Sequence, residues 1–318
     1  MRYALMSEPQ QGLSYDEILA LARTAEDAGF ESFFRSDHYS SFPGESGLPT
    51  TDAWATLAGL ARDTSRITIG SLVSPVTFRP PGNFAKVVAT VAEMSGGRVE
   101  VGLGAGWNEA EHDQHGLKFP LTRERFDMLE EQLAIVHGLW TEPDGWSYTG
   151  RHWTVRDARF RPMPPAPAGR RHPNLIVGGA GGPRMAALVA RYADELNISS
   201  ASPERITVAY ARLDAACRAA GREPTEVTRS AMTGVLVGET EDEVRGRVRA
   251  LLAMIGDADG DADAWLADRR DRWVIGTPDQ ARARVSEFEA AGAQRIMLQT
   301  FLPRDLEMIR LLGRTLLR

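Results

Sequence analysis

The chain has 318 residues, of which 43% are hydrophobic and 25% are charged, and this size suits a barrel domain of roughly 250 residues with insertions. The net charge of -6 arises from interspersed acidic and basic residues, so we expect no nucleic-acid partner. No run reaches the ~18 consecutive apolar residues of a membrane helix, so we expect no membrane partner either. The first ten residues lack the apolar core of a secretory signal, and Cys217 is the single cysteine. We therefore expect a cytoplasmic protein without a disulfide framework.

Short runs of β-branched and apolar residues alternate eight times with longer segments of helical period. This pattern is typical of a parallel sheet with crossover helices, and eight repeats favour closure into a (β/α)8 TIM barrel, with residues 1–318 as a single domain. The predicted strands cover residues 3–7, 32–36, 67–73, 99–104, 174–178, 195–199, 230–237 and 295–300.

Two of the predicted helices begin with a capping box. Ser14 stands three residues before Glu17, and Thr277 stands three residues before Gln280 with a proline between them. In this arrangement the hydroxyl and the later side chain satisfy each other's backbone N–H groups. Both signals are structural, and we assign them no chemistry.

Two segments interrupt the eight repeats. In the first, at about 145–173, two short aromatic runs flank Gly150 and predict a hairpin, which is followed by a proline-rich stretch. We interpret it as an insertion beside the barrel. The second, at about 256–271, has aspartates at alternate positions but lacks the terminal glutamate of a calcium loop. We expect a solvated or mobile loop there, and a candidate lid, because it follows the seventh strand.

The residues that follow each strand carry the chemistry in a barrel of this kind. After the second strand come Ser36, Asp37 and His38. A histidine beside an acid at a strand end is a candidate proton donor or acceptor, with Asp37 orienting or charging the ring. The alternative is an aspartate that caps a turn next to a surface histidine, and the spacing alone does not separate the two.

The segments after the third and fourth strands predict contacts with a planar ligand. Residues 71–81 combine small polar side chains with prolines, and residues 102–109 read Gly-Leu-Gly-Ala-Gly-Trp-Asn-Glu. The first segment suits a rigid shelf, and the glycines of the second let the backbone approach a ligand closely. A proline-terminated strand and loop is common without function, and a lone G-x-G-x-G without the last glycine of the dinucleotide fingerprint is weak evidence for a nucleotide. Glu109, His112 and His115 lack the spacing of a metal motif, so we expect no metal.

After the fifth strand, four glycines and Ala180 form the segment 178–182, which precedes a proline and a helix. Backbone N–H groups at the positive end of a helix dipole suit an anion, and a phosphate is the preferred interpretation. A tight turn is the alternative.

Together these segments resemble the luciferase-like monooxygenase superfamily, and more closely its branch of oxidoreductases that depend on the deazaflavin coenzyme F420. The resemblance spans nearly the whole chain. Its most specific parts are Ser36–His38, Ser71–Thr77, Gly104–Glu109, 175–182 and 192–197.

The resemblance implies that the cofactor ring lies on a bulge in the third strand, with a non-prolyl cis peptide between Leu72 and Val73. It also implies a homodimer. The cofactor-binding residues implied are Asp37, His38, Leu72, Val73, Ser74, Thr77, Trp107, Asn108, which would bond the pyrimidine edge, and Gly178, Gly179, Ala180, Gly181 and Gly182, which would hold the phosphate.

The expected activity is hydride transfer between F420 and a small organic substrate. His38 with Asp37 is the first candidate for proton transfer, and Glu109 and His112 are the next. An FMN-dependent monooxygenase and a non-catalytic flavin-binding barrel are the alternatives. The Ser36-Asp37-His38 sequence favours the deazaflavin, and the titratable pair argues against mere binding.

Overall fold

The computed structural model describes residues 1–44, 47–166 and 169–317. Eight parallel strands close into a barrel in the order β1-β2-β3-β4-β7-β8-β9-β11, and β11 pairs with β1. The barrel strands are β1 (Arg2–Ser7), β2 (Ser32–Arg35), β3 (Thr68–Pro75), β4 (Val99–Gly104), β7 (Asn174–Gly179), β8 (Glu195–Ile198), β9 (Thr228–Val237) and β11 (Arg295–Thr300).

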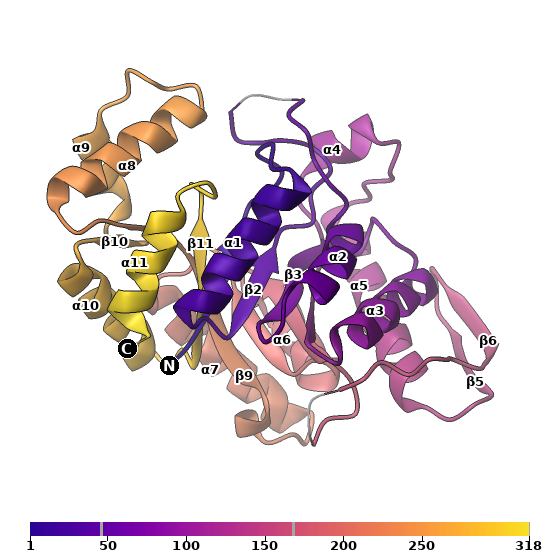
Figure 1. Cartoon of the computed structure of the whole chain (residues 1–318). Coiled ribbons are helices and arrows are strands. Elements are labelled where there is room, and N and C mark those ends of the chain that lie inside the picture. The colour runs from indigo at the N-terminus through magenta and orange to yellow at the C-terminus, as the bar shows by residue number, and fades with distance from the viewer. Residues whose placement is uncertain (45–46, 167–168, 318) are drawn as a thin grey trace.

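Helices surround the barrel, and the two termini lie close together, where α1 packs beside α11 (Figure 1). No helix in these described ranges is both long and apolar enough to cross a bilayer. The helices are α1 (Tyr15–Ala28), α2 (Ala53–Asp63), α3 (Pro81–Ser95), α4 (Glu109–Gln114), α5 (Thr122–Thr141), α6 (Pro183–Tyr192), α7 (Pro203–Ala219), α8 (Glu241–Met254), α9 (Ala262–Arg269), α10 (Pro278–Ala290) and α11 (Leu306–Leu316), with a 3-10 turn η1 at Pro224–Glu226.

The (β/α)8 barrel predicted from the sequence is confirmed, with each predicted strand present to within two residues at either end. Both capping boxes are also present, at the starts of α1 and α10. The sequence missed β10 (Val274–Gly276), a three-residue strand that pairs with β9. Its apolar run is too short to stand out from a loop.

The predicted hairpin is present as β5 (Trp146–Thr149) and β6 (Thr154–Ala158), which project from one side of the molecule (Figure 1). The carboxylate of Glu131 on α5 accepts the backbone N–H groups of Arg151, His152 and Trp153. One buried side chain therefore fixes the hairpin turn against the barrel.

The segment 256–271 differs from the solvated or mobile loop predicted for it, because it contains α9. Asp261 caps this helix by accepting the N–H groups of Asp263 and Ala264. Trp265 and Leu266 are buried against α8. One of the alternating aspartates, Asp261, is the N-cap of this helix, and Trp265 and Leu266 anchor the helix to the core. Trp265 also makes an edge contact with Trp273, which stacks on Phe301.

Alternate side chains on the strands fill the barrel in layers, as the two-residue period of a strand requires. The middle layer is apolar and includes Ala4, Phe34, Ile176 and Met297. Two residues earlier on their strands, Ser32, Asn174 and Arg295 form a polar floor together with Glu100 and Glu195. Two residues later the side chains face the carboxyl ends of the strands.

Arg295 is the centre of the floor and is fully buried. Its guanidinium lies 2.6 Å from Glu100, 3.1 Å from Glu195 and 2.6 Å from Glu31, and it donates to Ser32 over 2.5 Å. It also lies over the Phe34 ring. Burial alone would raise the pKa of Glu100, but Arg295 outweighs that effect, and the pKa of Glu100 lies below its usual value.

We expect Arg295→Met to lower the free energy of unfolding by about 3–5 kcal/mol, because it leaves Glu100 and Glu195 buried without a cation. Urea denaturation followed by circular dichroism measures the loss. The same substitution at Arg310, whose partner Glu307 is exposed, is the control and should change stability by less than about 1 kcal/mol.

The loss of stability in Arg295→Met should also depend on pH. A carboxylate with a lowered folded-state pKa contributes stability above its unfolded pKa of about 4.3, and that contribution is lost as the pH falls through the folded value. The difference between wild type and Arg295→Met should therefore be largest at neutral pH and shrink below about pH 4. A difference that grew on acidification would contradict the role of the ion cluster.

Candidate functional site

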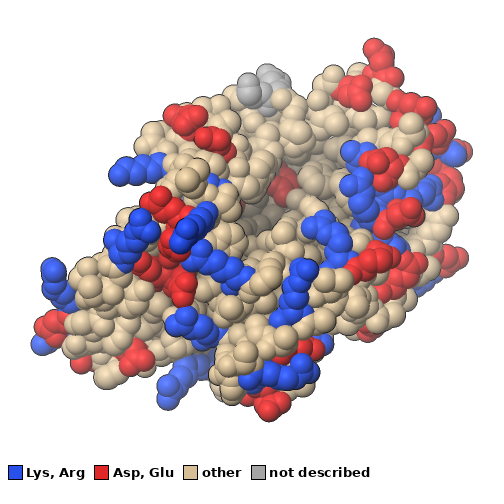
Figure 2. All heavy atoms as spheres, turned by 180° about the vertical axis from the view of Figure 1, so that it is seen from behind, with Lys and Arg blue, Asp and Glu red and all other residues tan. Residues whose placement is uncertain are grey.

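A cavity of about 640 Å³ opens at the carboxyl ends of the strands. Figure 2 shows a hollow in one face of the molecule, with acidic atoms inside it. The cavity is lined by residues of β1, β3, β4, β7, β8, β9 and β11 and by segments that follow the strands, including the one after β2. Active sites of (β/α)8 barrels lie at this end.

Strand β3 carries the predicted bulge and the predicted cis peptide between Leu72 and Val73, and both are confirmed. The register of β3 against β4 shifts between Ser71 and Ser74. Leu72, Val73 and Pro75 line the cavity. The bulge therefore presents backbone and apolar side chains to whatever occupies the mouth.

Three glycines on neighbouring strands make room for this bulge. A Cβ atom at Gly104 would lie 2.5 Å from Val73, one at Gly178 would lie 2.6 Å from it, and one at Gly102 would collide with the Ser71 carbonyl. The sequence alone predicts a ligand as the reason for these glycines. In the structure, the packing of β4 and β7 against Val73 already requires them.

The end of β7 and the residues that lead to α6 form a cradle in which the role of the glycines differs by position. Gly179 and Gly181 have positive φ values of 156° and 73°, which L side chains rarely adopt. Gly182 has an ordinary φ of -69°, and a Cβ there would meet nothing within 4 Å. Gly178, Gly179, Ala180 and Gly182 line the cavity. Because Gly182 precedes the first turn of α6, the free N–H groups of that turn suit an anion.

His38 and Glu111 of α4 both line the cavity, and the Glu111 carboxylate holds the His38 ring. The distance from Nδ1 to Oε1 of Glu111 is 2.9 Å. An ionised carboxylate can only accept, so Nδ1 carries the hydrogen and Nε2 is the ring nitrogen left for the cavity. The rings of Phe42 and Trp107 pack edge-on against His38. Sequence reasoning missed Glu111, because it lies 73 residues away from His38.

Asp37 does not make that contact. Its buried carboxylate pairs with Arg79 at 2.5 Å and accepts from the Ser74 hydroxyl at 2.6 Å. Arg79 also binds Asp52 and donates to Tyr39. Through Ser74 and Arg79, Asp37 thus joins the segment after β2 to β3 and to the segment after β3, behind the lining of the cavity. The orienting role predicted for Asp37 belongs in the structure to Glu111.

The other residues predicted for the site after β3 and β4 are either buried away from the cavity or exposed at its edge. His112 is fully buried, bonding Thr77 at 2.6 Å and the Asn108 carbonyl at 2.6 Å. None of these three is among the lining residues. Glu109 is exposed at the start of α4. Trp107 is 65% exposed and lines the cavity.

A polar belt at the ends of β1, β2 and β11 was also missed from the sequence. Glu8 accepts the side-chain amides of Gln10 and Gln299, and Gln10 accepts from Ser36 at 2.7 Å. All four residues line the cavity. The two-residue alternation could have found three of them, because Glu8, Ser36 and Gln299 follow Met6, Phe34 and Met297 at that interval.

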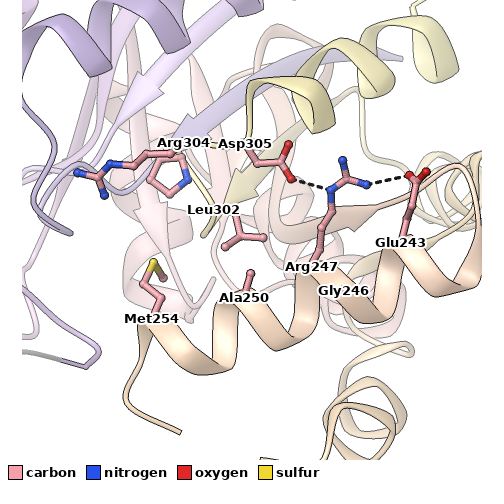
Figure 3. A pocket seen from close by; sticks show the side chains of 9 residues that line it. Glu243, Gly246, Arg247, Ala250, Met254, Leu302, Arg304 and Asp305 are labelled. Carbon is pink, nitrogen blue, oxygen red and sulfur yellow. Dashed lines mark hydrogen bonds and ion pairs between the residues drawn. The ribbon is translucent and has the colours of Figure 1, made fainter. Parts of the chain in front are cut away.

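A second hollow lies between α8 and the segment that joins β11 to α11 (Figure 3). Its charged side chains bind one another: Arg247 lies 2.7 Å from Asp305 and 3.4 Å from Glu243. Arg304 binds Glu17 at 2.6 Å. These charges are satisfied within the protein, so the hollow is no candidate site. No group of three or more metal-ligating side chains occurs in the part of the chain that the structure describes.

The sequence profile of luciferase-like monooxygenases matches residues 2–295. The chain belongs to the luciferase-like monooxygenase family. The match covers every barrel strand up to the first residue of β11.

Two curated relatives and one solved structure illustrate the family. An F420-dependent glucose-6-phosphate dehydrogenase of Microbacterium testaceum (strain StLB037) is 35% identical over 60% of this chain and 55% of its own length. An F420-dependent hydroxymycolic acid dehydrogenase of Mycobacterium tuberculosis (strain ATCC 25618 / H37Rv) is 32% identical over 72% and 61%. The matches thus span little more than half the length of these relatives. The structure of an F420-dependent secondary alcohol dehydrogenase with an F420-acetone adduct superposes with a TM-score of 0.81 at 20% identity, covering 99% of this chain and 98% of that one.

The cradle can be tested at Gly182. We expect Gly182→Asp to weaken the binding of a phosphate-bearing cofactor by about 10- to 100-fold, because it places a like charge at the start of α6. Gly182→Ser is the matched control and should retain binding within a few fold. Both residues are good N-caps, so neither should lower the melting temperature. Equal cofactor affinity of the two variants would contradict a phosphate site here.

Proposed function

We propose that this protein is an F420-dependent oxidoreductase that transfers a hydride between the deazaflavin and a small organic substrate. The observation that carries the proposal is a single cavity that brings together the bulge of β3, the cradle before α6 and the ring of His38. The deazaflavin supplies the carbon that gives or takes the hydride. The protein supplies the binding site, the orientation of both molecules and a path for the proton.

The residues present fit the cofactor. Leu72 and Val73 offer a shelf for a planar ring, and the open space at Gly182 with the free N–H groups of α6 offers a place for the phosphate. Phe126, Leu129 and Met185 add apolar surface to the same part of the cavity. The names of the two F420-dependent relatives support the deazaflavin as the occupant.

His38 is proposed as the group that gives or takes the proton that accompanies hydride transfer. Glu111 fixes its ring so that Nε2 faces the cavity, and Phe42 and Trp107 limit the ring's movement. When an alcohol is oxidised, its hydroxyl proton goes to Nε2. In the reverse direction, Nε2 returns the proton to the carbonyl oxygen.

Titration decides between the candidate cofactors. We expect the purified protein to bind F420 more tightly than FMN or a nicotinamide dinucleotide, because the phosphate site lies before α6 and the first strand-to-helix turn lacks a dinucleotide fingerprint. Fluorescence quenching gives the three affinities. Tighter binding of FMN would favour a monooxygenase instead, and preference for NADP without flavin binding would refute the proposal.

The role of His38 is tested by His38→Ala. We expect turnover to fall by roughly 10²–10⁴-fold while the fold and cofactor affinity are retained, because a positioned acid or base contributes about that much. His115→Ala is the matched control, since His115 is exposed at the end of α4 and does not line the cavity. Single-turnover rate, melting temperature and F420 affinity should be measured together. An unchanged rate in His38→Ala would remove His38 from the mechanism.

A further inference from the structure

The polar belt of Glu8, Gln10, Ser36 and Gln299 is not used by the cofactor shelf or by His38. Glu8 is 5% exposed and faces the cavity just after β1. Its Oε2 accepts from Gln10 at 2.7 Å, and its Oε1 accepts from the Gln299 amide. No Lys or Arg pairs with it among the residues that the structure describes, so two neutral amides are its contacts.

The position of the belt in the barrel places it on the substrate side of the mouth. Around the closed sheet, β11 lies three strands away from both β3 and β7, and β1 lies beside it. The proposed cofactor site uses β3 and the segment after β7. The part of the cavity next to β1 and β11 is therefore left for the substrate, and His38 borders it from the adjacent β2.

The charged side chains on the surface of the cavity are mainly acidic, and the cation Arg35, buried behind Ser36, attracts Glu8 without lining the cavity. Two carboxylates line it, Glu8 and Glu111, and no Lys or Arg is found among the described lining residues. His38 is the one basic side chain among the described residues that line the cavity, and it is already paired with Glu111. An ionised carboxylate has about four acceptor sites, and the two amides fill two of those on Glu8. A buried carboxylate gains from a further donor and repels an anion.

We propose, on the basis of the function proposed above, that the substrate is uncharged or cationic and that it donates an O–H or N–H hydrogen to Glu8. Substrates with a phosphate or carboxylate on that side are disfavoured. A sugar phosphate, the kind of substrate for which the Microbacterium relative is named, is among the disfavoured compounds if its phosphate lies on that side. In this proposal Glu8 selects the substrate, and His38 gives or takes the proton.

The test uses three probes that share a ring and a reactive alcohol and differ in one substituent. They are trans-4-aminocyclohexanol, trans-cyclohexane-1,4-diol and trans-4-hydroxycyclohexanecarboxylate. Calorimetric titration into the F420-loaded protein measures their affinities whether or not they are turned over. We expect the amine and the diol to bind at least ~10-fold more tightly than the carboxylate, with the amine the tightest.

Glu8→Gln removes the charge and keeps the shape. It should reduce the ratio of amine to carboxylate affinity by about 10-fold, while F420 affinity stays at the wild-type value. Glu93→Gln, at an exposed position on α3, removes the same charge far from the cavity and should leave the ratio unchanged. A loss of the same size in Glu93→Gln would assign the preference to net charge and overturn the role of Glu8.

The outcomes separate this inference from the function on which it rests. If the wild-type protein fails to bind F420, both are overturned. If it binds F420 but prefers the carboxylate, binds none of the probes, or keeps its charge preference in Glu8→Gln, the substrate inference alone is overturned.

Discussion

The buried guanidinium of Arg295 is the interaction on which the rest of the barrel depends. It joins β11 to carboxylates of β4 and β8 and to Ser32 of β2. A guanidinium without partners in this apolar interior would be very costly, so the strands are held in the one register that satisfies it. The closed end of the barrel is thereby fixed by charge, and the helices pack around a sheet whose alignment is already set.

This register decides what the open end presents. Because side chains alternate along a strand, a slip of one residue would turn every inward group outward. With Ser32 and Arg295 at the floor, Phe34 and Met297 fill the middle, and Ser36 and Gln299 reach the mouth. The polar belt around Glu8 follows from the floor by simple alternation.

The alternation of side chains is interrupted in β3, where a bulge brings Leu72 and Val73 to the cavity. The bulge turns Val73 toward β4 and β7, and glycines at 104 and 178 leave space for it. The segments beyond the strands then complete the mouth. Arg79 ties Asp37 to Asp52 behind it, and Glu111 reaches back from α4 to hold His38. A rigid wall of this kind allows a ring and a substrate to be held at a fixed distance.

The sequence by itself determined the features that depend on neighbours along the chain. Eight apolar runs predicted the strands, hydroxyl residues three positions before Glu17 and Gln280 predicted two helix starts, and Gly150 predicted the hairpin. The resemblance to known proteins located the cis peptide at Leu72. Tertiary structure alone decided which side chains meet: Glu111 rather than Asp37 at His38, and Thr77 with a buried His112. It also placed Glu8 beside Gln299. Local periodicity sets which way a side chain points, but contacts across tens to hundreds of residues are set by closure of the barrel and by the need to pair every buried charge.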